Sequence, residues 1–346
     1  MQCISIFRLL KLTFLSFLYF LSSYKISYAE MSSIGVLTGG SYSFANGVSS
    51  DGSVIVGDSG STDGHRAFKY DSTNGMTSLG VLAGGLYSYA YGASSDGSVI
   101  VGYSDTTDGH RAFKYDSTNG MTSLGVLTGG SYSLANGVSS DGSVIVGYSD
   151  TTDGSRAFKY VDGTMSSLGV LTGGSYSYAY GASSDGSVIV GYSDTTDGSR
   201  AFKYVDGTMS SLGVLTGGSF SQARGISSDG SVIVGYSGST DGHRAFKYDS
   251  TNGMTSLGVL TGGTSSYAYG ASSDGSVIVG YSDTTDGFRA FKYVDGTMSS
   301  LGVLAGGSYS FANGVSSDGS VIVGYSRSTD GTRAFIYRNV MLDVTN

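Results

Sequence analysis

The 346-residue chain has no proline, no tryptophan and one cysteine, and only 13% of its residues are charged. Although 57 residues are glycine, the missing proline and the lack of a Gly-x-y period exclude a collagen-like chain. Cys3 stands alone, so the chain cannot form an internal disulfide. A disordered chain is excluded because 39% of residues are hydrophobic and 12% aromatic. The composition favours short strands joined by turns of Gly, Asp and Ser.

Basic charge is also scarce, with 19 Lys and Arg against 27 Asp and Glu. The basic residues form no cluster, so we expect no nucleic-acid partner and no anionic lipid surface. No segment shows the periodicity of an amphipathic helix.

Residues 1–29 have the pattern of a secretory signal peptide. Arg8 and Lys11 precede the apolar run Leu12–Leu21, and a small-residue site allows cleavage after Ala29. The run is too short to span a bilayer, although an uncleaved membrane anchor is the alternative. We therefore expect a mature single domain, residues 30–346, that is exported to the periplasm, the cell surface or the medium without inserting into the membrane.

One unit of 44 or 45 residues occurs seven times. The segment Ser-Asp-Gly-Ser-Val-Ile-Val-Gly marks each unit, and Arg-Ala-Phe and Gly-Val-Leu segments keep step with it. The Asp of the marker segment stands at Asp51, Asp96, Asp141, Asp185, Asp229, Asp274 and Asp318.

Each unit contains four short strand patterns and no helix pattern. In the second unit they cover Tyr89–Ser94, Ser98–Ser104, Arg111–Tyr115 and Met121–Val126. Four strands in one repeat are typical of a β-propeller blade, and propellers have about four to eight blades. We predict an all-β, seven-bladed β-propeller, with an open β-solenoid as the alternative.

Two segments could complete the last blade and close the ring. Met31–Val36 repeats the fourth-strand pattern before the first unit, and a degenerate copy occurs at Val340–Val344. The sequence leaves the choice between them open.

The ordered set of repeat motifs resembles one family. Ala-Phe plus an aromatic residue, an Asp-Gly-Thr-Met turn, Leu-Gly-x-Leu-x-Gly-Gly and a Gly-x-Val-x-Val-Gly strand together resemble the HAF-repeat family, over residues 31–340. In this chain Arg-Ala-Phe replaces the family's His-Ala-Phe. The resemblance implies a bacterial, extracellular repeat protein and supplies no catalytic residues.

The first strand of the unit carries the most informative variation. The second residue of its alternating face is Tyr in units two, four and six, Asn in units one, three and seven, and Arg in unit five. Repacking of large against small residues explains the Tyr-Ala and Asn-Val pairings. The alternative is a ligand-facing aromatic and amide surface. The candidate ligand-facing residues are Tyr91, Tyr180, Tyr269, Asn46, Asn136, Asn313 and Arg224.

No candidate for catalysis or metal binding emerges. His65, His110 and His243 share one slot that tolerates other residues, which indicates an exposed loop. The Asp105–Gly109 loop offers oxygen ligands but lacks the ligand spacing of an EF-hand, so we expect no cofactor, with calcium the one ion to consider. The Arg of each Arg-Ala-Phe segment is expected to pair with a turn Asp.

The preferred interpretation is an exported, monomeric, non-catalytic scaffold that binds a protein or glycan through several equivalent sites. A glycan-binding, lectin-like propeller is one alternative, although the missing Trp removes a strong stacking residue. A hydrolase or lyase with its site in the central channel is the other.

Overall fold

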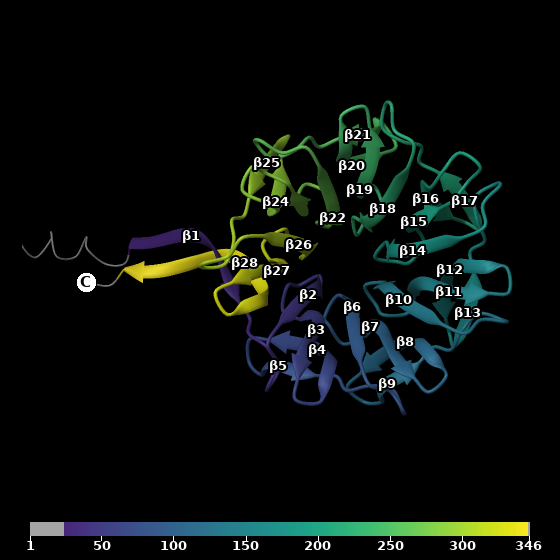
Figure 1. Cartoon of the computed structure of the whole chain (residues 1–346), viewed down its shortest axis with the longest axis horizontal. Coiled ribbons are helices and arrows are strands. Elements are labelled where there is room, and N and C mark those ends of the chain that lie inside the picture. Colours follow the sequence, from purple (N-terminus) through teal and green to yellow (C-terminus); the bar gives the residue numbers. More distant parts are fainter. Residues whose placement is uncertain (1–23, 345–346) are drawn as a thin grey trace, which may run out of the picture. The chain divides into compact units, whose positions relative to one another are not determined.

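The computed structural model describes residues 24–344, and its strands form seven separate four-stranded antiparallel sheets (Figure 1). Residues 31–337 make up one compact unit, in which the sheets surround a central axis as the blades of a propeller. The predicted seven-bladed fold is confirmed, and the solenoid alternative was wrong. Residues 24–344 contain no helix that could cross a membrane.

The strands occupy equivalent positions in every blade. The first strands are β2 (Ser43–Val48), β6 (Ser88–Ala93), β10 (Ser133–Val138), β14 (Ser177–Ala182), β18 (Ser221–Ile226), β22 (Ser266–Ala271) and β26 (Ser310–Val315). The second strands are β3 (Ile55–Ser61), β7 (Ile100–Thr106), β11 (Ile145–Thr151), β15 (Ile189–Ser193), β19 (Ile233–Ser239), β23 (Ile278–Ser282) and β27 (Ile322–Ser328). The third strands are β4 (Gly64–Asp71), β8 (Gly109–Asp116), β12 (Gly154–Val161), β16 (Arg200–Val205), β20 (Gly242–Asp249), β24 (Arg289–Val294) and β28 (Gly331–Val344). The fourth strands are β5 (Gly75–Ser78), β9 (Gly120–Ser123), β13 (Thr164–Ser167), β17 (Thr208–Ser211), β21 (Gly253–Ser256), β25 (Thr297–Ser300) and β1 (Tyr24–Ser33).

The single-residue difference between repeat lengths lies in the hairpin turn between the third and fourth strands. In the short version Asp162 and Gly163 have φ angles of 49° and 79°, as a two-residue turn with two positive φ angles requires. In the long version Asp71 Oδ1 accepts hydrogen bonds from the backbone N–H groups of Thr73 and Asn74.

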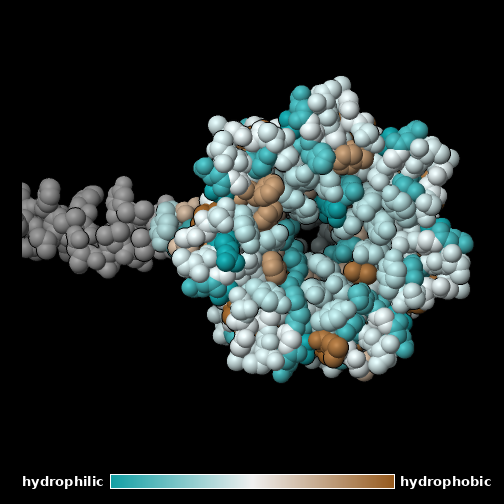
Figure 2. Space-filling view, viewed as in Figure 1, coloured by the Kyte–Doolittle hydropathy of each residue, from teal (hydrophilic) through white to brown (hydrophobic). Residues whose placement is uncertain are grey.

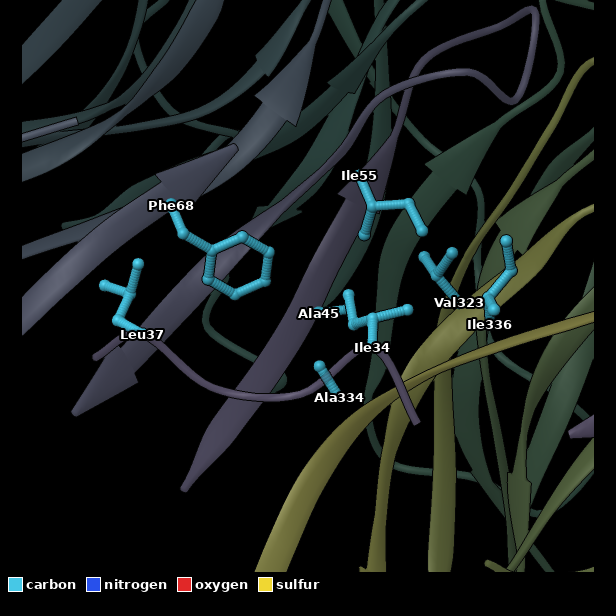
Figure 3. Close-up of a cluster of buried hydrophobic side chains, with 8 residues drawn as sticks. All are labelled: Ile34, Leu37, Ala45, Ile55, Phe68, Val323, Ala334 and Ile336. Atoms are coloured by element: carbon cyan, nitrogen blue, oxygen red, sulfur yellow. The ribbon is translucent and has the colours of Figure 1, made fainter. Parts of the chain in front are cut away.

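The hydrophobic core consists of seven clusters, each built between two neighbouring blades. Between blades one and two, Val56 and Ala67 face Ile100 and Phe113, and Phe113 is fully buried. One sheet cannot bury both of its faces alone, so each blade depends on its two neighbours. The equivalent cluster in Figure 3 joins Val323 and Ala334 of blade seven to blade one.

The N-terminal strand closes the ring. The seventh sheet has the order β1-β28-β27-β26, so β1 takes the place of the fourth strand. Met31 packs against the cluster of Phe335, and Ile34 N–H donates to the Ala334 carbonyl at 3.0 Å. The C-terminal copy at 340–344 continues β28 instead of forming a strand of its own.

Candidate functional site

A β-bulge in the first strand of every blade creates the central surface. In blade one the register between β2 and β3 shifts between Ala45 and Gly47, which leaves Asn46 without a partner across the sheet. The same shift occurs in the other six blades. A bulge re-aims the side chain of the extra residue, and here that residue faces the axis.

The seven bulge residues are the seven predicted ligand-facing residues, and all of them line one axial pocket (Figure 2 shows the opening at the centre of the ring). The pocket has a volume of about 330 Å³. Tyr148 and Leu134 also line it, and sequence reasoning missed both. A second cavity of about 220 Å³ continues from the same bulge residues along the first strands. That the seven residues bind a ligand remains a prediction.

Arg224 is the single positive charge among the residues that line the pocket. Its guanidinium carbon lies 4.1 Å from the ring centroid of Tyr180, within the range of a cation–π contact. One terminal nitrogen donates to Gln222 Oε1 at 2.6 Å and to the Tyr236 hydroxyl at 3.2 Å. Blade five alone has Gln and Arg at these two positions of the first strand, and the Gln222 side chain holds the guanidinium of Arg224 through a hydrogen bond.

Within residues 24–344, no carboxylate forms an ion pair with Arg224. Among the side chains that the structure describes, the one ion pair joins His65 to Asp58. Arg224 Nε is buried and makes no hydrogen bond. A buried charge without a counter-ion is costly, so a group of this kind calls for an explanation such as a role at a functional site.

Tyrosines make up half of the remaining residues that line the pocket. Tyr91, Tyr180 and Tyr269 lie against the second-strand tyrosines of their own blades, with ring centroids 5.7–6.0 Å apart. Burial raises the pKa of Tyr269, and the positive charge of Arg224 opposes that rise. Burial also raises the pKa of Tyr91, so its hydroxyl stays protonated. These residues offer flat faces and hydroxyl groups to a ligand.

The three asparagines link neighbouring blades. Asn136 Nδ2 donates to the Ala179 carbonyl at 2.8 Å, and Asn313 Nδ2 donates to the Ala45 carbonyl at 2.9 Å. Asn46 makes the same kind of bond to Ala90 at 3.0 Å. Each carboxamide keeps further hydrogen-bonding capacity for the pocket.

Asp58 beside the pocket is a residue that the sequence prediction missed. Its side chain accepts hydrogen bonds from Asn46 Nδ2 at 2.9 Å and from His65 Nε2 at 2.6 Å. All six other blades have Tyr at this position of the second strand. That one exception in an otherwise constant segment was the available signal.

The structure corrects two further predictions. His65, His110 and His243 lie in third strands rather than loops, and each forms a hydrogen bond with a tyrosine hydroxyl. The Arg residues of the Arg-Ala-Phe segments bind backbone carbonyls instead of Asp side chains. Arg111, for example, donates to the Ser131 carbonyl of the next blade at 2.6 Å.

The carboxylate of the first Asp in each Asp-Thr-Thr-Asp-Gly loop is held by the protein itself. Asp150 Oδ1 accepts the backbone N–H groups of Ser131 and Tyr132 at 2.6 and 2.8 Å. Within residues 24–344, no three His, Cys, Asp or Glu side chains come together as metal ligands.

Comparison with known proteins identifies relatives of the fold. No family model matches the chain, and no curated protein sequence matches it. An oligogalacturonate lyase from Vibrio parahaemolyticus shares 13% identity and has a TM-score of 0.62, covering 92% of this chain and 97% of the lyase. An oligogalacturonate lyase solved in complex with manganese has 13% identity and a TM-score of 0.61, covering 92% of this chain and 96% of that one. TolB from Acinetobacter baumannii has 14% identity and a TM-score of 0.48, and the match covers 84% of this chain and 64% of TolB. At such identities the likeness to the lyases shows a common fold.

The prediction of a non-catalytic, multivalent scaffold was wrong. Two of the solved propellers that match almost the full chain are lyases. Geometry gives the physical reason, because the bulges direct the variable residues of all seven blades into one pocket. Several equivalent sites on separate blades would require those side chains to point apart.

Proposed function

We propose that the protein is a lyase-type enzyme whose axial pocket binds an acidic sugar through the sugar's carboxylate. The observation that carries this proposal is Arg224, a cation in the pocket wall with no carboxylate partner among the described side chains. A guanidinium suits a planar carboxylate because its N–H groups match both oxygens. The uronic acid units of an oligogalacturonate, the substrate class in the names of the two lyases, have such a carboxylate.

The other pocket groups suit a sugar ring. Tyr180 and Tyr269 on either side of Arg224 offer aromatic faces for the C–H face of a sugar, and the asparagines offer donors and acceptors for hydroxyl groups. The volume of about 330 Å³ lies at the lower end of the range for small-ligand sites. A terminal sugar unit fits this space better than the interior of a polymer chain.

The same arrangement supports elimination. An Arg–carboxylate contact stabilises the negative charge that develops when the hydrogen on the carbon next to the carboxylate is removed. The electrons of that C–H bond form the new double bond, and the glycosidic oxygen leaves and takes up a proton. Tyr180 and Tyr269 flank Arg224 and are the candidates for both proton transfers. One of them, as its phenolate, would accept the proton removed from carbon, and the hydroxyl of the other would donate the proton that the leaving oxygen takes up.

The pocket does not suit the manganese present in one of the lyase structures. Manganese prefers carboxylate and other oxygen ligands, whereas the lining residues supply amides, phenols and one guanidinium but no carboxylate or imidazole. The steps proposed for this chain therefore use its own side chains.

Export also belongs to the proposal. The signal-peptide pattern at 1–29 supports it, although residues 1–23 lie outside the described part of the chain. Cleavage after Ala29 would leave residues 30–33 of β1 to complete the last blade.

The test uses trigalacturonate and the full-length protein purified after export. We expect calorimetric binding of trigalacturonate and release of an unsaturated product, detected by its ultraviolet absorbance. Arg224→Gln should weaken binding by about 10–100-fold, as expected for loss of a charge-assisted contact. Arg327→Gln, which removes an exposed Arg outside the pocket, is the matched control and should bind normally. Equal binding by wild type and Arg224→Gln would refute the assignment.

Replacing each flanking tyrosine separates binding from chemistry. Tyr180→Phe and Tyr269→Phe remove only a hydroxyl, so we expect trigalacturonate binding to change little. The variant that removes the proton-transferring group should lose turnover by at least about a hundredfold. Full turnover in both variants would exclude the tyrosines from this role.

A further inference from the structure

Asp58 makes blade one different from every other blade beside the axial pocket. It is 5% exposed, and it replaces the second-strand tyrosine found in the other six blades. His65 Nε2 lies 2.6 Å from Asp58 Oδ2, and His65 Nδ1 lies 2.9 Å from the Tyr42 hydroxyl. The ring of Tyr89 covers His65 with a centroid distance of 4.4 Å. This network holds the Asp58 carboxylate in one position.

The Asp58 carboxylate determines which atom Asn46 presents to the pocket. Asn46 Nδ2 donates to Asp58 Oδ1 at 2.9 Å and to the Ala90 carbonyl at 3.0 Å. Both partners can only accept, so the carboxamide nitrogen must face them and both of its hydrogens are used. The group left for a ligand is Asn46 Oδ1, an acceptor. Asn136 and Asn313 each use one hydrogen in this way and can still donate to a ligand.

Opposite charges thus act on different parts of the pocket wall. On the blades next to blade one, burial raises the pKa of Tyr325 to about 12, and the negative charge of Asp58 adds to the rise. Burial raises the pKa of Tyr91 as well, and Asp58 is the next largest cause. On blades three and six, the charge of Arg224 opposes the rise that burial causes in the pKa of Tyr148 and Tyr269. An anion is therefore disfavoured beside blade one and favoured beside blade five.

We propose that the axial pocket binds a hydroxy acid in one orientation, with its carboxylate on Arg224 of blade five and a hydroxyl group donating to Asn46 Oδ1 of blade one. This inference rests on the proposed function and adds the orientation in which the sugar is bound. Asp58 and His65 act as positioning residues, because they orient Asn46 and do not line the pocket. The ligand class is a ring that carries a carboxylate and free hydroxyls, as a uronic acid does.

The repeats supply a variant that removes this network while keeping a sequence the fold already uses. Asp58→Tyr combined with His65→Ser gives blade one the residues that blade three has beside Asn136, namely Tyr148 and Ser155. His110→Ser in blade two is the matched control, since His110 binds the Tyr87 hydroxyl and no carboxylate. Asp58→Asn, which removes the charge with little change in shape, is measured in place of the double variant if that variant fails to fold.

Two probes test the orientation by calorimetry, galacturonate and cyclohexanecarboxylate, which has the ring and the carboxylate but no hydroxyl. The double variant should bind galacturonate about tenfold more weakly, the loss expected for one oriented hydrogen bond. Its affinity for cyclohexanecarboxylate should be unchanged or higher, because a nearby negative charge is gone. His110→Ser should match wild type with both probes.

The outcomes separate the inference from the function on which it rests. An unchanged ratio of the two affinities in the double variant would overturn the orientation, even if Arg224→Gln abolishes binding of both probes. If Arg224→Gln binds both probes as wild type does, the proposed function itself fails.

Discussion

Blades one and three share an asparagine at the bulge, yet the two asparagines face the pocket differently. In blade three the second strand has Tyr148, and Asn136 makes a single bond to the next blade. In blade one Asp58 takes the second hydrogen of the Asn46 amide. The comparison teaches that the shared residues build the ring and that the exceptions, Asp58 in blade one and Arg224 in blade five, give the pocket its chemistry.

The largest expected effect on stability comes from replacing a core residue that all seven blades share. Phe113 is fully buried between blades one and two, so Phe113→Ala should lower the free energy of unfolding by about 3–5 kcal/mol. Urea denaturation followed by circular dichroism measures the change. Phe288, which is 41% exposed, is the control, and Phe288→Ala should cost about 0.5 kcal/mol or less. Similar losses for the two variants would show that the inter-blade clusters are not the source of stability.

A smaller change in stability, in the opposite direction, is expected when Gln222 and Arg224 of blade five are replaced by the residues of another blade. Gln222→Leu with Arg224→Asn gives β18 the residues of β10, and Ile226 supplies the large neighbour that accompanies asparagine in blade three. Because the change removes a buried cation without a counter-ion, we expect about 1–2 kcal/mol of added stability together with loss of trigalacturonate binding. Urea denaturation and calorimetry measure the two effects. A destabilised variant would contradict the view that Arg224 is retained for function at a cost in stability.

The smallest effect per residue concerns the Ser-Asp-Gly turns. Hydrogen bonds from Ser139 and Ser143 lower the pKa of Asp141 to about 2, and Asp185 is lowered in the same way. A lowered pKa in the folded state means that each turn contributes stability that is fully present above about pH 4 and is lost as the pH falls toward 2. Urea midpoints should therefore fall over this range. Asp141→Asn should make the fall slightly less steep, and an unchanged slope would exclude this contribution.

The sequence contained enough information for the fold but only part of the site. Strand patterns and Asn-Gly or Asp-Gly turns recur in every unit, so their number and order were predictable. The sequence could not show that the strand with Met31 closes the ring, because the copy near Val340 has a similar pattern. The bulge at Asn46 could not be seen either, since a register shift depends on pairing between strands. A reading of the sequence that lacks the bulge places the variable residues on seven separate blade surfaces instead of in one pocket.

Asp58 shows a different limit. Its departure from Tyr was visible in the sequence, but its meaning depends on contacts with Asn46 and His65, which are 12 and 7 residues away along the chain. Those contacts require the packing of three strands of one blade. A single exception in a repeat is therefore worth noting before the structure is known, and its role follows only from its neighbours.

A crystal structure of the protein with bound trigalacturonate tests the central claim most directly. We predict one sugar unit in the axial pocket, with its carboxylate within hydrogen-bonding distance of the Arg224 guanidinium. A trigalacturonate bound on the outer surface of the blades, or in the pocket with its carboxylate away from Arg224, would contradict the account.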